Sequence, residues 1–81
     1  MPYSIPYIGP VIRAARLAAG LSQSELAARA GMTQASISLI ESGSDVRVSR
    51  LQQVAGALDL VPMLVPRKAS GLVEGVIGSL P

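Results

Sequence analysis

A tight turn between two short helices is the feature that most constrains how this chain can fold. A small residue, Ala27, is followed four positions later by Gly31, and then six and nine positions beyond by Ile37 and Ile40. Gly31 can adopt the positive φ that such a turn requires. Ala27 is small enough for two helices to cross there, and isoleucines three apart anchor the second helix in a core. This spacing predicts two helices that pack closely across a glycine turn.

Capping residues place the boundaries of these two helices. Ser22 and Glu25, three apart, form a capping-box pattern, which predicts a helix over residues 24–30 that ends at Gly31. Thr33 can cap the helix that follows. Two helices joined so tightly indicate a helix-turn-helix motif, with an ordinary αα-hairpin as the alternative.

Two further helices are expected on either side of this pair. Pro10 suits the first turn of a helix, because the N–H that proline lacks is not used there, and this helix should stop at Gly20. Ser49 and Gln52 repeat the capping-box spacing, so a last helix is expected to open there and to end near Leu58.

Residues 60–66, LVPMLVP, have the composition of an extended strand. Pro62 and Pro66 are four apart, so their missing N–H donors lie on one edge of that strand, which suits an edge position. The other edge is free to pair through Val61, Met63 and Val65. Because a single strand is not stable alone, we expect antiparallel pairing with the same strand of a second copy, as a homodimer.

The chain divides into three parts by composition. Residues 1–8 are expected to form an extended arm, residues 9–66 the helical domain with its dimerisation strand, and residues 67–81 a C-terminal tail. Residues 69–81 combine three glycines with apolar residues at helical spacing. They form either a frayed terminus or a segment that folds onto a partner protein.

Composition excludes several classes of function. An 81-residue chain without Phe or Trp can bury only a small hydrophobic core, so we expect a second copy of the chain to stabilise it. Because Cys and His are also absent, the usual zinc ligands and the Ser-His and Cys-His nucleophile pairs are missing. We therefore expect that the protein is not an enzyme and that it binds no cofactor and no metal ion. The net charge of +2 is too small to indicate nucleic acid by itself.

The sequence also argues against a membrane protein. Arg, Asp, Gln or Pro interrupts every apolar window of about 18 residues, the length that a membrane span needs. The N-terminal ten residues contain three prolines and no basic residue, unlike a signal peptide. A soluble, cytoplasmic protein is expected.

The helix that follows Gly31 has an unusual outward face. If Met32, Ile37 and Ile40 point into the core, the outward residues carry no charge, where a solvated helix would normally place Lys and Glu. These outward residues are Gln34, Ala35, Ser38 and Leu39. A small, neutral, hydrogen-bonding face indicates a surface that contacts a partner.

The segment GLSQSELAARAGMTQASISLIESG resembles the lambda-repressor and Cro-like (Xre) family. The resemblance covers residues 8–60 and implies an all-α domain of four to five helices. The extension DVRVSRLQQVAGALDLVPMLV is more particularly similar to HipB-type antitoxins, which continue from the last helix into a strand that pairs across the dimer.

The resemblance implies a dimeric repressor that binds double-stranded DNA at an inverted repeat. Its HipB-like version would autoregulate its own operon and bind a kinase-like, HipA-like toxin. A stand-alone Xre regulator without a toxin is the alternative within DNA binding. A helix-turn-helix module used only for protein contacts is the alternative from another class.

In this family the helix after the turn lies in the major groove, which explains the uncharged face. Gln34 can bond bidentately to adenine N6 and N7, and Ala35 and Leu39 can contact thymine methyl groups. Ser38 can donate or accept without strong selection. Leu39 has two alternatives to a thymine contact: it contacts another protein, or its exposure is simply tolerated.

Phosphate contacts are expected at the ends of helices. Gln23 matches the family position at which a glutamine and helix N–H groups meet the DNA backbone. Ser44, Arg47 and Arg50 would form a second phosphate clamp, with a solvated surface charge as the alternative for Arg50. Thr33 can contact phosphate or simply cap its helix.

Arg16 and Glu41 occupy positions that this family often pairs. The resemblance therefore implies a salt bridge within the domain that orients the recognition helix. We expect this pair to be structural and to take no part in base reading.

Overall fold

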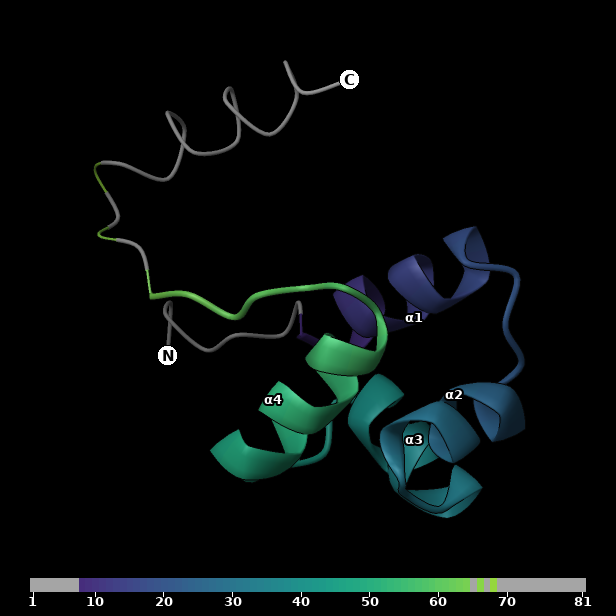
Figure 1. Cartoon of the computed structure of the whole chain (residues 1–81). Coiled ribbons are helices and arrows are strands. Elements are labelled where there is room, and N and C mark those ends of the chain that lie inside the picture. The colour runs from purple at the N-terminus through teal and green to yellow at the C-terminus, as the bar shows by residue number, and fades with distance from the viewer. Residues whose placement is uncertain (1–7, 65, 67, 69–81) are drawn as a thin grey trace.

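The computed structural model describes residues 8–64, 66 and 68, and within them the fold is a small array of four helices (Figure 1). These are α1 (Ile8–Ala18), α2 (Gln23–Ala30), α3 (Gln34–Glu41) and α4 (Val48–Ala57). α2 packs against both α3 and α4, while α1 packs against α3. The described residues contain no β-strand, so this part of the chain is all-α as expected.

The expected caps of the helix pair are confirmed. The backbone N–H of Glu25 donates to Ser22 Oγ at 3.0 Å, and the Ser22 N–H donates to Glu25 Oε1 at 2.9 Å. These bonds lower the pKa of Glu25. Gly31 has φ of 68°, and Thr33 Oγ1 accepts from the N–H of Ser36 at 3.1 Å. α2 begins at Gln23, one residue before the predicted start, because Ser22 itself is the cap.

The core is aliphatic and is centred where three of the helices meet. Leu26 of α2, Ile37 of α3 and Val54 of α4 are completely buried. Ile12, Ala27 and Ile40 complete the contact between the helices, so the small residue expected at the crossing lies in the core. Burial of the two isoleucines turns the opposite side of α3 toward solvent.

The predicted start of the last helix is wrong. α4 begins at Val48, and Arg47 occupies its N-cap position without a side-chain hydrogen bond. Ser49 and Gln52 therefore lie inside the helix and do not form a capping box. The partial burial of Val46 and Leu51 and the complete burial of Val54 set this register, because apolar contacts with the core outweigh a single polar cap.

Gly9 allows α1 to approach the end of α3 closely. A Cβ atom at this position would lie 2.5 Å from the backbone oxygen of Glu41 and 2.9 Å from that of Ile40. Only glycine fits without a shift of one of the two helices.

α1 includes Ile8, so it begins one residue before the predicted domain boundary.

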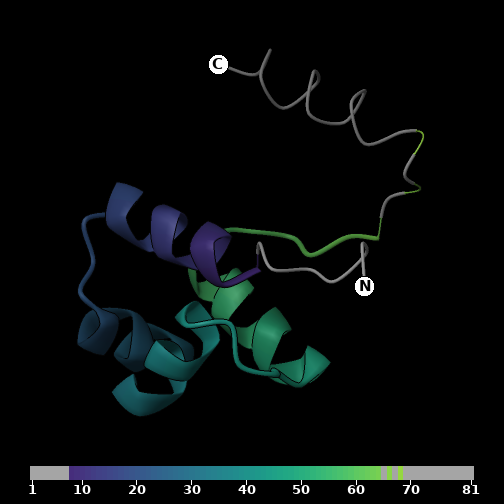
Figure 2. The same ribbon diagram turned by 180° about the vertical axis from the view of Figure 1, so that it is seen from behind.

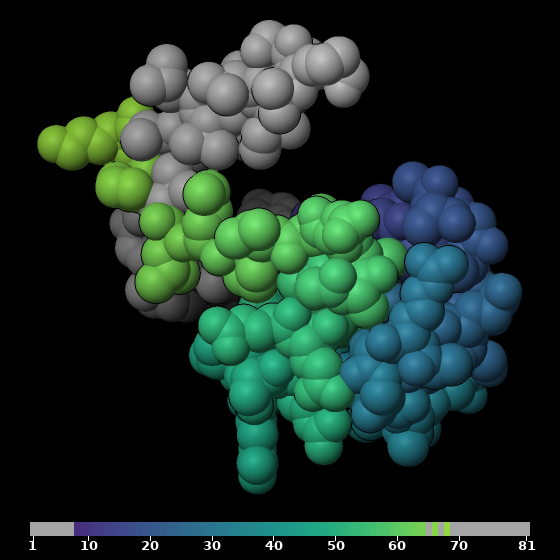
Figure 3. All heavy atoms as spheres, in the orientation of Figure 1, coloured from purple at the N-terminus to yellow at the C-terminus, as the bar shows by residue number. Residues whose placement is uncertain are grey.

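The segment that follows α4 runs over the surface and past the start of α1 (Figures 2 and 3). Leu60 packs against the core, whereas Val61, Met63 and Leu64 are 82%, 66% and 97% exposed. Residues 60–64 form no strand within the single chain. The predicted pairing with a second copy stays a prediction, and Val65 lies outside the described residues.

The expected arm and tail also fall largely outside the described part of the chain, which omits residues 1–7, 65, 67 and 69–81. Within the described part, the longest helix is α1 with 11 residues. None of these helices has the length and apolar character needed to cross a membrane.

Candidate nucleic-acid interface

The exposed face of α3 contains all four residues that were predicted to contact bases. Gln34, Ala35, Ser38 and Leu39 are exposed, and Leu39 keeps 57% of its surface accessible. Ile37 and Ile40 are buried on the opposite side of the helix. α3 itself carries no charge on its outward side, so hydrogen bonds and apolar contacts are what this face can offer to a partner.

A chain of hydrogen bonds connects α1 to the start of α3. Arg16 donates from Nε to Glu41 Oε2 at 2.6 Å and from Nη2 to Glu41 Oε1 at 3.0 Å. Gln23 Nε2 donates to the same Glu41 Oε1 at 3.2 Å. Gln34 Nε2 then donates to Gln23 Oε1 at 2.7 Å. The two residues of the expected ion pair thus contact each other, and both glutamines that were predicted to contact DNA are linked to them.

The ion pair is shielded from solvent and its charges are stabilised. The Arg16 and Glu41 side chains are only 9% and 4% exposed. Hydrogen bonding to Arg16 lowers the pKa of Glu41, against the opposing effect of burial, and Gln23 and the charge of Arg13 lower it further. Hydrogen bonding to Glu41 raises the pKa of Arg16, whose Nη1 also donates to the Leu21 carbonyl at 2.8 Å. Both groups therefore stay ionised near neutral pH.

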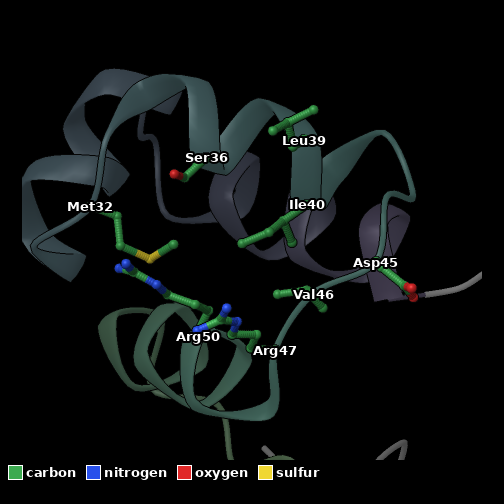
Figure 4. Close-up of a pocket in the computed structure, with 8 residues that line it drawn as sticks. All are labelled: Met32, Ser36, Leu39, Ile40, Asp45, Val46, Arg47 and Arg50. Atoms are coloured by element: carbon green, nitrogen blue, oxygen red, sulfur yellow. The ribbon is translucent and has the colours of Figure 1, made fainter.

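A shallow groove separates α3 from the start of α4 and contains two of the predicted phosphate contacts. Arg47 and Arg50 lie on its α4 side, and Met32 and Ile40 extend toward them from the opposite side (Figure 4). The groove has a volume of about 380 Å³. Its lining comprises Met32, Ser36, Leu39, Ile40, Asp45, Val46, Arg47 and Arg50. Two arginines at the start of α4 thus lie beside the uncharged face of α3.

The N-terminal end of α4 is suited to anions. Its N-cap, Arg47, makes no side-chain hydrogen bond to the first turn, whose N–H groups have no partner within the helix. Arg47 and Arg50 are exposed and add positive charge at the same end. A phosphate could accept hydrogen bonds from this end of the helix.

Two other predicted phosphate contacts have different surroundings. Ser44 lies exposed in the loop between α3 and α4, where its N–H donates to the Leu39 carbonyl at 3.1 Å. The Thr33 hydroxyl caps α3 and lies 2.9 Å from Ser36 Oγ. Capping accounts for Thr33, and a phosphate contact there stays a prediction.

Two features of the site were not predicted from the sequence: the hydrogen bond between Gln23 and Gln34, and the close approach of α1 to the end of α3 at Gly9. The glutamines are first residues of α2 and α3, and they meet because the turn brings the two helix starts together. Gly9 lies next to Pro10 at a helix start, where the sequence pattern shows no need for a small residue. Only the packing of α1 on α3 reveals that need.

Comparison with known proteins agrees with this geometry. The chain is similar to y4dL, an uncharacterized HTH-type transcriptional regulator of Sinorhizobium fredii (strain NBRC 101917 / NGR234), with 41% identity over 80 residues. That alignment covers 98% of this chain but 41% of the relative, so the chain spans less than half of the relative's length. Residues 12–64, which include most of α1 and all of α2 to α4, match the helix-turn-helix family HTH_3. The chain therefore belongs to the helix-turn-helix family HTH_3.

Proposed function

We propose that this chain is a dimeric, sequence-specific DNA-binding repressor of transcription that reads the major groove with α3. The observation that carries the proposal is the exposed, uncharged face of α3, whose Gln34 is held by Gln23 at 2.7 Å. The starts of α2 and α4 flank this face. The name of the S. fredii relative, a transcriptional regulator, supports the same class of function.

Base reading is assigned to four residues. Gln34 can accept from adenine N6 and donate to N7, the pattern that distinguishes adenine in the major groove. Ala35 and Leu39 offer apolar surface to thymine methyl groups, and Ser38 offers a hydroxyl that either donates or accepts. All four are exposed on one helix, as insertion into the groove requires.

Phosphate binding is assigned to the helix ends beside α3. Gln23 has a second N–H besides the one that it donates to Glu41. At the other side, Arg47, Arg50 and the first turn of α4 supply charge and free N–H groups. Ser44 and Thr33 would add hydroxyl contacts. Such contacts fix the orientation of the domain on DNA without selecting a sequence.

Dimerisation is assigned to the strand that residues 60–66 would form with a second copy. Val61 and Met63 are largely exposed in the single chain and would pair across the two-fold axis together with Val65. Two copies related in this way would place two α3 helices on an inverted repeat. Burial of these side chains would also compensate for the small core of each copy.

The proposal includes a HipB-like antitoxin role, in which the protein represses its own operon and binds a HipA-like kinase toxin. Its support is the resemblance of residues 45–65 to those antitoxins and the apolar spacing within residues 69–81. Deletion of residues 69–81 should leave operator affinity unchanged and weaken capture of the toxin encoded by the adjacent gene. Loss of folding or of dimerisation on this deletion would assign the tail to the protein's own core instead.

In vitro selection from random duplex DNA tests the central claim. The full chain should enrich an inverted repeat, and its affinity for that site should exceed its affinity for random DNA by about 10³-fold or more. Uniform, weak binding to every duplex would contradict sequence-specific repression. Complete absence of DNA binding would favour the protein-interaction module.

A further inference from the structure

We propose that Leu64 of each copy packs against the core of the other copy, beside Leu60, in the dimer formed through residues 60–66. This inference rests on the proposed dimerisation strand and deepens it, because it states which side chain crosses from one copy to the other. Among the large apolar side chains of the described residues, Leu64 has the greatest exposed fraction, 97%. Contact with a second copy would remove this apolar surface from water.

The turn that ends α4 determines which side of the following segment faces the core. Asp59 adopts a positive φ of 56°. The N–H of Leu60 donates to the Ala55 carbonyl at 2.8 Å, and the N–H of Asp59 donates to the Gly56 carbonyl at 3.2 Å. These two bonds form a Schellman motif, in which the residue after the left-handed one packs back on the helix. Leu60 accordingly lies partly buried against the core.

The alternation of side chains then assigns the two sides of the strand. In an extended strand every second residue points to the same face, so Leu60 and Leu64 share the face that is turned toward the core. Val61 and Met63 lie on the opposite face. At about 3.3 Å per residue, Leu64 is about 13 Å further along the strand than Leu60. It therefore lies beyond the part of its own core that Leu60 reaches, as its exposure in the single chain reflects.

A second copy brings Leu64 back to that core. In an antiparallel ribbon with its two-fold axis at Met63, Leu64 of one copy stands opposite Pro62 of the other. Residues that stand opposite each other lie on the same face of the ribbon, and diagonal neighbours are about 7–8 Å apart, within reach of long side chains. Leu60 is such a diagonal neighbour of Leu64 from the second copy.

The edge of the core around Leu60 has apolar surface left to cover. Ile8, Leu58 and Leu60 pack against the core yet stay only partly buried. The segment that contains Leu60 runs past the start of α1, where Ile8 lies (Figure 2). Leu64 of the second copy would cover this edge. Because the two copies are related by a two-fold axis, the same contact forms twice in each dimer.

Two matched substitutions test the assignment of faces. Leu64→Thr removes apolar surface from the face turned toward the core, Val61→Thr removes it from the opposite face, and threonine suits a strand in both. Leu64→Thr should raise the Kd of the dimer by about 30-fold or more, because two leucines lose their contact in each dimer. Val61→Thr should raise it by less than about fivefold. Leu64→Ile, which keeps the apolar surface, should stay within the same limit. Sedimentation equilibrium of the full chain measures each Kd.

Oxidation of cysteine variants checks the register independently, because the chain has no cysteine of its own. Positions 62 and 64 stand opposite each other only between copies. A mixture of Pro62→Cys and Leu64→Cys chains should therefore form mainly mixed disulfide dimers, with one chain of each kind. Either variant alone should crosslink far less, because its two cysteines are diagonal neighbours about 7–8 Å apart, whereas a disulfide requires Cα atoms within about 7 Å.

Each outcome separates this inference from the proposed dimer. If the parent stays a monomer at every concentration, the dimer is wrong and the inference falls with it. If the parent is a dimer but the mixture crosslinks no better than either cysteine variant alone, the register and with it the exchange of Leu64 are wrong. If mixed disulfides form but Leu64→Thr and Val61→Thr weaken the dimer equally, the ribbon stands and the exchange is wrong. If Leu64→Thr lowers the melting temperature of the dilute monomer and leaves the Kd unchanged, Leu64 packs on its own chain, which also contradicts the exchange.

Discussion

Alanine at Gly9 should destabilise the domain, although alanine favours helices more than glycine does. The added Cβ would lie 2.5 Å from the Glu41 backbone oxygen, whereas ordinary contact begins at 3.4 Å. The obstacle is backbone at the end of α3, which cannot rotate away as a side chain could. α1 and α3 would have to separate by about 0.9 Å, at the same place where Arg16 bonds to Glu41.

The expected magnitude follows from two opposing effects. Overpacking against rigid atoms costs about 1–3 kcal/mol, and the helix preference of alanine returns up to about 1 kcal/mol. A net loss of about 1–2 kcal/mol should lower the melting temperature by roughly 4–16 °C in a domain of this size.

Gly56→Ala supplies a matched control, because Gly56 also lies in a helix but its Cβ would meet nothing within 4 Å. This variant should be more stable by about 0.5–1 kcal/mol. Thermal unfolding followed by circular dichroism, at several protein concentrations to separate dimerisation from folding, measures both effects. Equal stabilisation by the two substitutions would refute the close approach of α1 and α3.

Three other predictions concern the ion pair, the DNA contacts and the dimer. Glu41→Gln should destabilise the domain by about 3 kcal/mol at neutral pH, because it leaves Arg16 without its counter-charge. Since the folded-state pKa of Glu41 lies below its ordinary value of 4.5, its contribution is present above that pH and is lost as the pH falls through the folded pKa. Denaturant titrations should therefore show a steeper loss of stability in acid for the parent than for the variant, and equal slopes would argue against the ion pair. Gln34→Ala should cost about 1–3 kcal/mol at a cognate site only, whereas Arg47→Ala should weaken binding to all sequences and reduce the salt slope by about one. Gel-shift titrations at several salt concentrations distinguish the two, and a loss shared equally by random DNA would exclude base reading by Gln34. Met63→Pro removes an N–H from the proposed pairing edge and should weaken the dimer, so sedimentation that finds parent and variant equally tight would contradict the shared strand.

Features encoded within a few residues could be predicted from the sequence. Ser22 and Glu25 form the expected capping box, Gly31 takes the expected positive φ and Thr33 caps α3. Each depends on atoms within three or four residues of the chain, and a cap or turn is stable once those few dihedral angles are set. The inward isoleucines, and hence the outward face of α3, follow from helical periodicity in the same way.

Features that depend on residues far apart in the chain were decided by tertiary packing. The local spacing of Ser49 and Gln52 matched a capping box, yet burial of Val54 placed the start of α4 elsewhere. Gln23 and Gln34 meet only because α2 and α3 cross with their first residues adjacent. A cap contributes about 1 kcal/mol, whereas the burial of several apolar side chains contributes more, so packing prevails wherever the two conflict.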